Sequence, residues 1–129
     1  MELGLEGRIA LVTGASGGIG RRICERLHEE GAVVVAHGHT GVARLAPWCE
    51  PLGIDTERAD LGDDAAADAL IDRIVSRHGR LEVLIANAGR WPEPDLPLHR
   101  TPAADLRSTV DDNLWSALWS ARAFVRALE

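Results

Sequence analysis

A glycine-rich segment near the start of this chain lies between an apolar run and an amphipathic stretch. The apolar run, residues 9–12, has the unbroken apolar character of a parallel strand covered on both faces. The segment that follows reads Thr13-Gly14-Ala15-Ser16-Gly17-Gly18-Ile19-Gly20. A helix is expected over residues 18–30, where Ile19, Ile23 and Leu27 form one apolar stripe. A strand, a glycine loop and a helix in this order predict a loop that holds the phosphates of a nucleotide.

Three glycines of this loop have separate expected tasks. Gly14 lets the chain leave the strand in a tight turn, Gly18 removes the side chain where a diphosphate approaches the backbone, and Gly20 lets the helix pack closely on the strand. The start of the helix supplies unpaired N–H groups and the positive end of its dipole. A glycine cluster can also be an ordinary flexible turn, but the flanking strand and helix favour a phosphate loop.

The rest of the chain alternates apolar runs with helical patterns. Further strands are expected over 32–37, 53–59 and 81–86, further helices over 64–78 and from 101 to the end, a broken helical segment over 42–51 and a loop over 89–100. This alternation implies right-handed crossovers and a parallel sheet. The sequence therefore predicts an α/β fold, a Rossmann-type doubly wound parallel sheet that stops after its fourth strand and the following helix. It forms a single dinucleotide-binding unit over residues 1–129.

The last expected helix has more apolar residues than one buried face needs. Thr101 is expected to cap it, with Pro102 in its first turn. One apolar stripe is made of Leu106, Val110, Leu114, Ala117, Ala121 and Val125, and Trp115 and Trp119 lie on a neighbouring face. Two interpretations stay open: a core helix with bulky side chains, or a helix that packs against a partner outside this sequence.

Charge and composition argue against several classes of partner. The net charge is −6, so there is no basic field to attract a nucleic acid. Residues 1–7 are unlike a signal peptide, and no run approaches the ~18 apolar residues of a membrane span. Cys24 and Cys49 lack a metal-ligand spacing, and as two free thiols they favour a reducing, cytoplasmic setting. We expect no metal site, no nucleic-acid partner and no membrane contact.

Four motifs along the chain carry a specific resemblance. They are Thr13-Gly14-x-x-x-Gly18-x-Gly20 in the loop, Asp60-Leu61 after the third expected strand, Asn87-Ala88-Gly89 at the end of the fourth, and Asn113 in the last helix. In type, order and spacing they resemble the N-terminal part of a short-chain dehydrogenase/reductase, over essentially the whole chain. The first motif has that family's glycine spacing rather than the generic Gly-x-Gly-x-x-Gly fingerprint.

The resemblance implies a bound nicotinamide dinucleotide and the residues around it. Asp60 would bond the adenine amino group, the Asn87-Ala88-Gly89 motif would border the cofactor, and Asn113 would help to hold a proton-relay water as a catalytic residue. The expected cofactor-binding residues are Thr13, Gly14, Ser16, Gly17, Gly18, Ile19, Gly20, His39, Thr40, Asp60, Leu61, Asn87, Ala88 and Gly89.

The choice between NADP and NAD depends on the end of the second expected strand. NAD-dependent members usually carry an acid there, which bonds the ribose 2′-hydroxyl. Here the stretch His37-Gly38-His39-Thr40 has no acid, and His39, Thr40 or Arg44 can meet a 2′-phosphate. Against this, Gly17 stands where many NADP-preferring relatives have a basic residue. The balance favours NADP over NAD.

The resemblance also identifies what this sequence lacks. Family members continue with a Ser on the next strand and a Tyr-x-x-x-Lys pair on the next helix, which carry out general acid–base catalysis. The chain has no Tyr, all 14 of its basic residues are Arg, and it stops at Glu129, about where that half begins. We therefore expect an incomplete oxidoreductase, inactive alone, that transfers hydride between NAD(P) and a carbonyl or alcohol substrate only when the missing half is present.

Two other hypotheses stay open. The chain can be a stand-alone nucleotide-binding module without turnover. Alternatively, it can be a structural subunit that pairs its fourth strand, with Glu82 to Ile85, and its Trp-bearing helix with a second copy or a complementing chain. The Ser and His residues form no hydrolase elbow or His-Glu-x-x-His metal motif, so a different active site is not expected.

Overall fold

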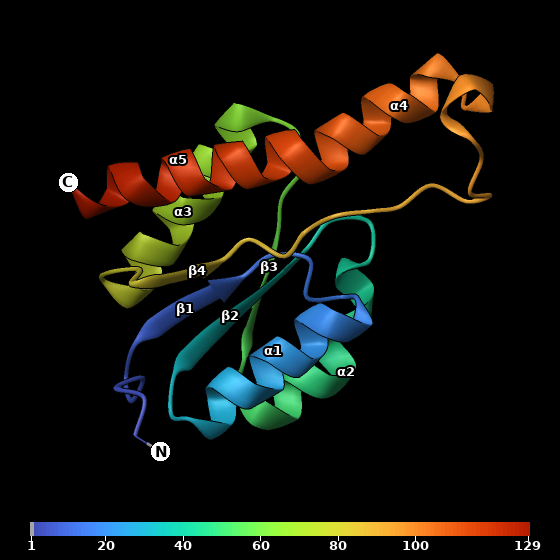
Figure 1. The fold of residues 1–129 in the computed structure, drawn as a ribbon. Helices are drawn as coiled ribbons and strands as arrows, with labels where there is room; N and C mark the ends of the chain where they lie inside the picture. Colours follow the sequence, from blue (N-terminus) through green and yellow to red (C-terminus); the bar gives the residue numbers. More distant parts are fainter. Residues whose placement is uncertain (1) are drawn as a thin grey trace.

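Four parallel strands lie side by side in the order β3-β2-β1-β4 in the computed structural model, which describes residues 2–129 (Figure 1). They are β1 (Ile9–Val12), β2 (Val33–Gly38), β3 (Asp55–Arg58) and β4 (Val83–Ile85). In the sheet register Leu11 of β1 lies between Val35 of β2 and Leu84 of β4. The chain runs outward from β1 to β3 and then returns to β4 on the other side of β1. This order confirms the predicted Rossmann-type sheet. Met1, the first residue of the expected domain, lies outside the described residues.

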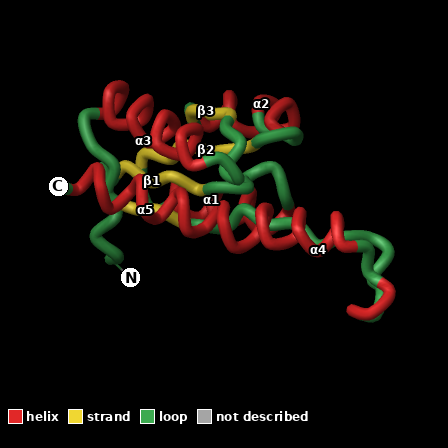
Figure 2. The backbone as a smooth tube through the Cα atoms, turned by 90° about the horizontal axis from the view of Figure 1, so that it is seen from above, coloured by secondary structure: helices red, strands yellow, loops and turns green. Residues whose placement is uncertain are grey.

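Helices cover both faces of the sheet (Figure 1). α1 (Gly18–Glu29) and the short α2 (Ala46–Cys49) lie on one face, and α3 (Asp64–His78) and α5 (Ser116–Leu128) lie on the other. α4 (Ala103–Val110) continues through a π-helical turn, Asp111–Trp115, into α5 and extends beyond the sheet (Figure 2). Between residues 2 and 129, no helix combines the length and the apolar character that crossing a membrane requires.

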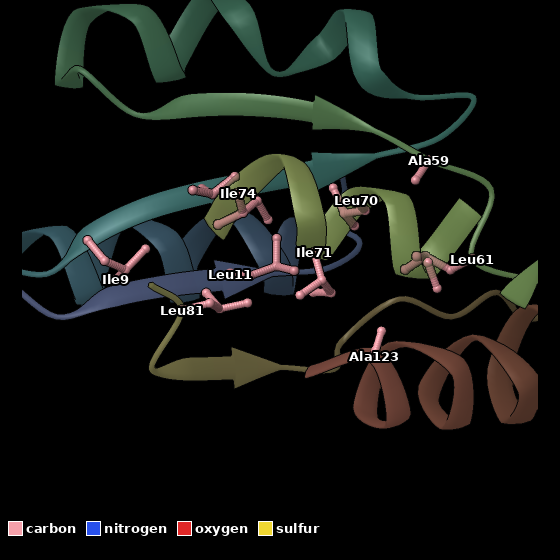
Figure 3. Close-up of a cluster of buried hydrophobic side chains, with 11 residues drawn as sticks. Ile9, Leu11, Ala59, Leu61, Leu70, Ile71, Ile74, Leu81 and Ala123 are labelled. Carbon is pink, nitrogen blue, oxygen red and sulfur yellow. The ribbon is translucent and has the colours of Figure 1, made fainter. Parts of the chain in front are cut away.

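β1 is buried from both sides, which explains its unbroken apolar run. Ile9 and Leu11 face α3 (Figure 3), and Ala10 and Val12 pack on the opposite face, with α1. All four side chains are at most 5% exposed. Because side chains alternate along a strand, only a strand covered on both faces buries four successive residues.

The segments flanking the helices follow the sequence signals in part. Asp63 caps α3 by accepting a hydrogen bond from Ala66 N (3.1 Å), and Gly79 ends the helix with φ +84°, as expected. The expectation for Thr101 is wrong. Its hydroxyl donates to Pro97 O (3.1 Å), at the short 3-10 turn Leu98–Arg100, and Pro102 occupies the cap position of α4 instead.

The two predicted apolar stripes are not buried as a whole. In α1, Ile23 and Leu27 pack against the core, but Ile19 does not. Ile19 is 74% exposed, because α1 turns Gly20 and Cys24 toward the sheet. In α5 the buried residues are Ser116, Ser120 and Ala123. The large residues of the predicted stripe, by contrast, lie at the surface, with exposed fractions of 39% to 57% for Leu106, Val110, Leu114 and Val125.

Small side chains explain why this face of α5 is the buried one. The Ser120 hydroxyl donates a hydrogen bond to Ser116 O (2.7 Å). A serine can therefore be buried between two helices without an unpaired polar group. Two ion pairs then join α5 to α3: Arg122 with Asp64 (3.2 Å) and Arg126 with Asp68 (2.9 Å). Ala123 lies in the core on this side of α5, with Trp119 and Phe124 packed against it, while the longer apolar stripe stays exposed.

Candidate nucleotide-binding site

A cavity of about 320 Å³ opens at the carboxyl edge of the sheet. In parallel α/β sheets this edge is where ligands bind, at the point where the strand order reverses. The ends of all four strands contribute to its lining, together with the turn before α5. The lining residues are Gly14, Ser16, His37, His39, Thr40, Gly41, Arg44, Ala59, Asp60, Leu61, Gly62, Ala88, Gly89, Arg90, Asp112 and Ser116.

Eight of the predicted cofactor-binding residues line this cavity. They are Gly14, Ser16, His39, Thr40, Asp60, Leu61, Ala88 and Gly89. The other six lie beside it: Thr13 and Asn87 support the loop, Gly17 precedes α1, Gly20 packs under it, and Gly18 and Ile19 border a groove on the outer side of α1.

The first turn of the loop requires a glycine. Gly14 has φ +65°, and a Cβ added there would lie 2.7 Å from Ala88 Cα. Any larger residue would therefore be strained twice, by its backbone angle and by contact with another backbone. The predicted tight turn at Gly14 is confirmed.

At the start of α1, the side-chain position of one glycine has free space around it and that of another has none. A Cβ on Gly18 would meet no atom within 4 Å, whereas a Cβ on Gly20 would lie 2.8 Å from both Ala15 Cα and Asn87 Nδ2. Gly17 precedes the helix in an extended conformation and offers no side-chain cap. The N–H groups of the first turn of α1 have no intrahelical acceptors, an arrangement that can bind an anion, and the side-chain position of Gly18 is open.

Hydrogen bonds from β4 hold the loop from one side. Asn87 Nδ2 donates to Thr13 O (3.1 Å) and Gly14 O (3.2 Å), and Ala88 N donates to the Thr13 hydroxyl (2.9 Å). Thr13 is 1% exposed. These contacts fix the glycine loop, at the end of β1, to the segment that follows β4.

Asn113 clamps the chain that follows β4. Its Nδ2 donates to Arg90 O (2.7 Å) and Thr109 O (2.9 Å), and its Oδ1 accepts from Arg90 N (3.1 Å). A Cβ on Gly89 would lie 2.5 Å from the same Oδ1. Asn113 therefore positions the edge of the cavity through Arg90, while its predicted role toward a proton-relay water stays a prediction.

The end of β3 brings Asp60 to the cavity with its carboxylate accessible. Asp60 Oδ1 accepts from Gly62 N (3.0 Å), which fixes a local turn and leaves Oδ2 free of that bond. Leu61 is 4% exposed and belongs to the core under α3, so its side chain supports this turn.

The end of β2 is tightly packed at Gly38, and an arginine lies beside it. A Cβ on Gly38 would lie 3.0 Å from Val42 Cα, in the 3-10 turn Val42–Arg44. Above Gly41, the Arg44 Nη2 and the Ser16 hydroxyl oxygen each lie 2.7 Å from the point where a Cβ would stand. A guanidinium and a hydroxyl thus come together at the rim of the cavity.

His37 lines the cavity but is not among the predicted site residues. It is 3% exposed, its Nδ1 accepts from Gly14 N (3.1 Å), and its Nε2 lies 2.8 Å from Ala59 O. Burial lowers the pKa of the imidazole below its usual value. The signal was a single histidine at the end of a valine-rich run, where a buried polar side chain needs partners.

We expect stability to fall at mildly acidic pH because of His37. A base whose pKa is lowered on folding binds more protons when unfolded, so its contribution is complete above pH 6.5 and is lost as pH falls toward the lowered pKa. His39 adds to this lowering and Glu57 opposes it, while residues 13–17 of the loop hold no titratable side chain. Thermal melts between about pH 5 and pH 7.5 should show a steeper loss in the wild type than in His37→Gln. Equal slopes would contradict this assignment.

Another cavity, of about 480 Å³, lies on the outer side of α1. Its lining comes from this one helix and consists of Gly18, Ile19, Arg22, Ile23, Arg26 and Leu27. Since no second element faces these residues, they form an open groove without converging polar groups.

Comparisons with known proteins agree with this geometry. The family model described as short chain dehydrogenase matches residues 8–129. The chain is 38% identical over 129 residues to 2,3-dihydroxy-2,3-dihydro-p-cumate dehydrogenase of Pseudomonas putida, covering 95% of this chain and 49% of that protein. It is 38% identical over 118 residues to cis-4-hydroxycyclohexanecarboxylate dehydrogenase of Sinomonas cyclohexanicum, covering 83% and 44%.

A solved structure has the same fold. The F98L/F202L mutant of a Serratia marcescens short-chain dehydrogenase/reductase superposes with a TM-score of 0.87 at 27% identity, covering 95% of this chain and 51% of that one. The chain spans about half the length of the relatives that it matches. The glycine loop, the four strand ends and the family match lead to one conclusion: the chain belongs to the short-chain dehydrogenase/reductase family.

Proposed function

We propose that this chain is the cofactor-binding part of an oxidoreductase and binds a nicotinamide dinucleotide at the carboxyl edge of its sheet. The observation that carries the proposal is the uncapped start of α1, where the side-chain position of Gly18 is open, beside a cavity lined by all four strand ends. An anionic diphosphate suits such a helix start. When bound, the cofactor supplies the hydride that is exchanged with a carbonyl or alcohol.

The residues present fit such a group. Gly14 forms the tight turn of the loop, Gly18 leaves its side-chain position open, Asp60 offers a carboxylate oxygen to the adenine, and Gly89 lines the cavity. Asn113 holds this inner border through Arg90. We propose that the substrate is an alcohol or a carbonyl compound. The two relatives named above are dehydrogenases, and their names describe hydroxylated substrates.

We propose NADP rather than NAD as the preferred cofactor. Arg44 and Ser16 converge at the rim where the ribose 2′-group of a bound dinucleotide would lie, and a side chain on Gly38 would collide with Val42. A charge-assisted bond from Arg44 favours a 2′-phosphate, while no acid at this strand end selects a 2′-hydroxyl.

Replacing Arg44 should separate the two cofactors. We expect Arg44→Ala to weaken NADPH binding about tenfold and to change NADH binding by less than about twofold, because only NADPH carries the 2′-phosphate. Fluorescence titration of both nucleotides measures this, with Arg58→Ala as a control, since Arg58 is an exposed arginine on β3 that does not line the cavity. Tenfold tighter binding of NAD than of NADP by the wild type would refute the preference.

We further propose that turnover requires residues outside these 129. The sequence holds neither Tyr nor Lys, so the acid–base pair of the family cannot come from it. Cofactor binding without turnover is the expected behaviour of the isolated chain, and turnover by the pure chain would overturn this point. A reducing, cytoplasmic setting is proposed as well, because Cys24 and Cys49 are both buried free thiols.

Association with a second copy or a complementing chain is a further candidate. The large side chains Leu106, Val110, Leu114, Leu118 and Val125 are exposed along α4, the π-helical turn and α5. Contiguous apolar surface of this kind is usually covered by a partner. A strictly monomeric chain at high concentration in sedimentation experiments would remove this candidate.

A further inference from the structure

A single buried imidazole joins the glycine loop to the end of β3. The His37 Nδ1 faces Gly14 N at 3.1 Å, and its Nε2 faces Ala59 O at 2.8 Å. Because a backbone N–H can only donate, Nδ1 must accept, and Nε2 must then carry the proton and donate to Ala59 O. Both ring nitrogens are satisfied in one state only: the neutral ring protonated at Nε2.

The main chain of His37 holds the next residue of the loop. His37 O accepts from Ala15 N (2.8 Å), so two successive loop amides, those of Gly14 and Ala15, bond to one residue. On the opposite side, Asn87 Nδ2 donates to Gly14 O (3.2 Å). Gly14, with φ +65°, is therefore held at both its N–H and its C=O.

We propose that His37 is a positioning residue for cofactor binding: its neutral imidazole holds the Gly14 N–H and so fixes the loop in front of α1. A buried N–H that loses its acceptor destabilises the conformation it is in. The backbone then favours another conformation in which this N–H is hydrogen-bonded. For Gly14, such a rearrangement would move the loop that is open to the diphosphate. The hydrogen bond to Ala59 O also connects this loop to the residue before Asp60. One ring therefore holds both the loop expected to contact the diphosphate and the segment expected to contact the adenine.

The surroundings keep the ring neutral near pH 7. Burial lowers the pKa of His37 and outweighs the hydrogen bond to Ala59, which raises it; His39 lowers the pKa further, and Glu57 on β3 raises it. Asp60 lies in the same cavity lining, and residues 13–17 contribute no charge. A protonated ring would point an N–H from Nδ1 at the Gly14 N–H, and two donors would face each other.

Two amide replacements separate the two bonds of the ring. The Oδ1 of an asparagine stands where Nδ1 does and can accept from Gly14 N, while the Nε2 of a glutamine stands where the ring Nε2 does and can donate to Ala59 O. Each variant keeps one bond and loses the other. A merely structural role predicts that nucleotide affinity follows stability in both.

The test is NADPH affinity of His37→Asn against His37→Gln, each beside its melting temperature. We expect the asparagine variant to bind within about threefold of the wild type and the glutamine variant at least about tenfold more weakly than the asparagine variant. Equal losses in the two variants, or losses that track their melting temperatures, would overturn the proposal.

The wild type provides a readout that needs neither a folded variant nor a nucleotide. In ¹⁵N NMR at pH 7, the His37 ring should show a bare Nδ1 and a protonated Nε2, and the Gly14 amide should exchange slowly. A ring protonated at Nδ1, or rapid exchange of the Gly14 amide, would overturn the proposal. This inference rests on the nucleotide site proposed above. If NADPH fails to bind the wild type while these NMR signatures hold, the proposed function fails and the link from His37 to the loop stands.

Discussion

A Gly18→Asp variant is expected to bind NADPH at least about 100-fold more weakly than the wild type and to melt within about 3 °C of it. The new side chain enters open space, since a Cβ at this position meets no atom within 4 Å. A carboxylate in the first turn of α1 also interacts favourably with the helix dipole, so we expect no loss of folding stability. The same carboxylate would occupy the place proposed for the diphosphate and would repel its negative charge.

A Gly18→Asn variant is the matched control for size without charge. It should weaken NADPH binding less than Gly18→Asp, because it fills the same volume without a negative charge. Calorimetric titration and thermal melts of the two variants measure both quantities. Wild-type affinity in Gly18→Asp would mean that the phosphates do not lie at this helix start.

A Gly20→Ala variant should lose about 2–3 kcal/mol of unfolding free energy. Its methyl group would lie 2.8 Å from Ala15 Cα and would also collide with Gly14 O, and both of these atoms are backbone that cannot rotate away. The helix or the loop must shift as a whole. Alanine is otherwise the better helix former by about 1 kcal/mol, so a loss would run against intrinsic propensity.

Gly18→Ala, two residues earlier in α1, is the control for Gly20→Ala. There the methyl group meets nothing, and we expect unchanged or slightly higher stability in denaturant titrations. If both alanines had the same effect on stability, the close packing of α1 on the loop would not be a determinant of the fold.

Local signals predicted the parts of this fold that local chemistry determines. Residues 9–12 form the central strand because four apolar residues in succession need cover on both faces, and Asp63 and Gly79 delimit α3 through bonds with their own neighbours. Gly14 turns where the spacing predicted it. In each case the residue type itself carries the signal, although the helices that cover β1 and the contact of Gly14 with Ala88 come from distant segments.

The failures have a common physical origin in contacts between distant segments. α5 buries Ser116 and Ser120 because small residues permit close approach to α3, and the apolar stripe alone carries no information on that approach. Ile19 is exposed because Gly20, not an apolar side chain, faces the sheet. The role of His37 depends on Ala59, which is brought beside it only when β3 pairs with β2.

We propose that a nicotinamide dinucleotide binds at the carboxyl edge of the sheet, with its diphosphate at the start of α1. The decisive measurement is a titration of the ¹⁵N-labelled chain with NADPH, followed through its backbone amides. The largest shifts should fall on Gly14, Gly18 and Ala88, with Asp60 and Thr40 following along the cavity. No shifts at saturating NADPH, or shifts confined to Ile23, Arg26 and Leu27 in the outer groove of α1, would contradict the claim.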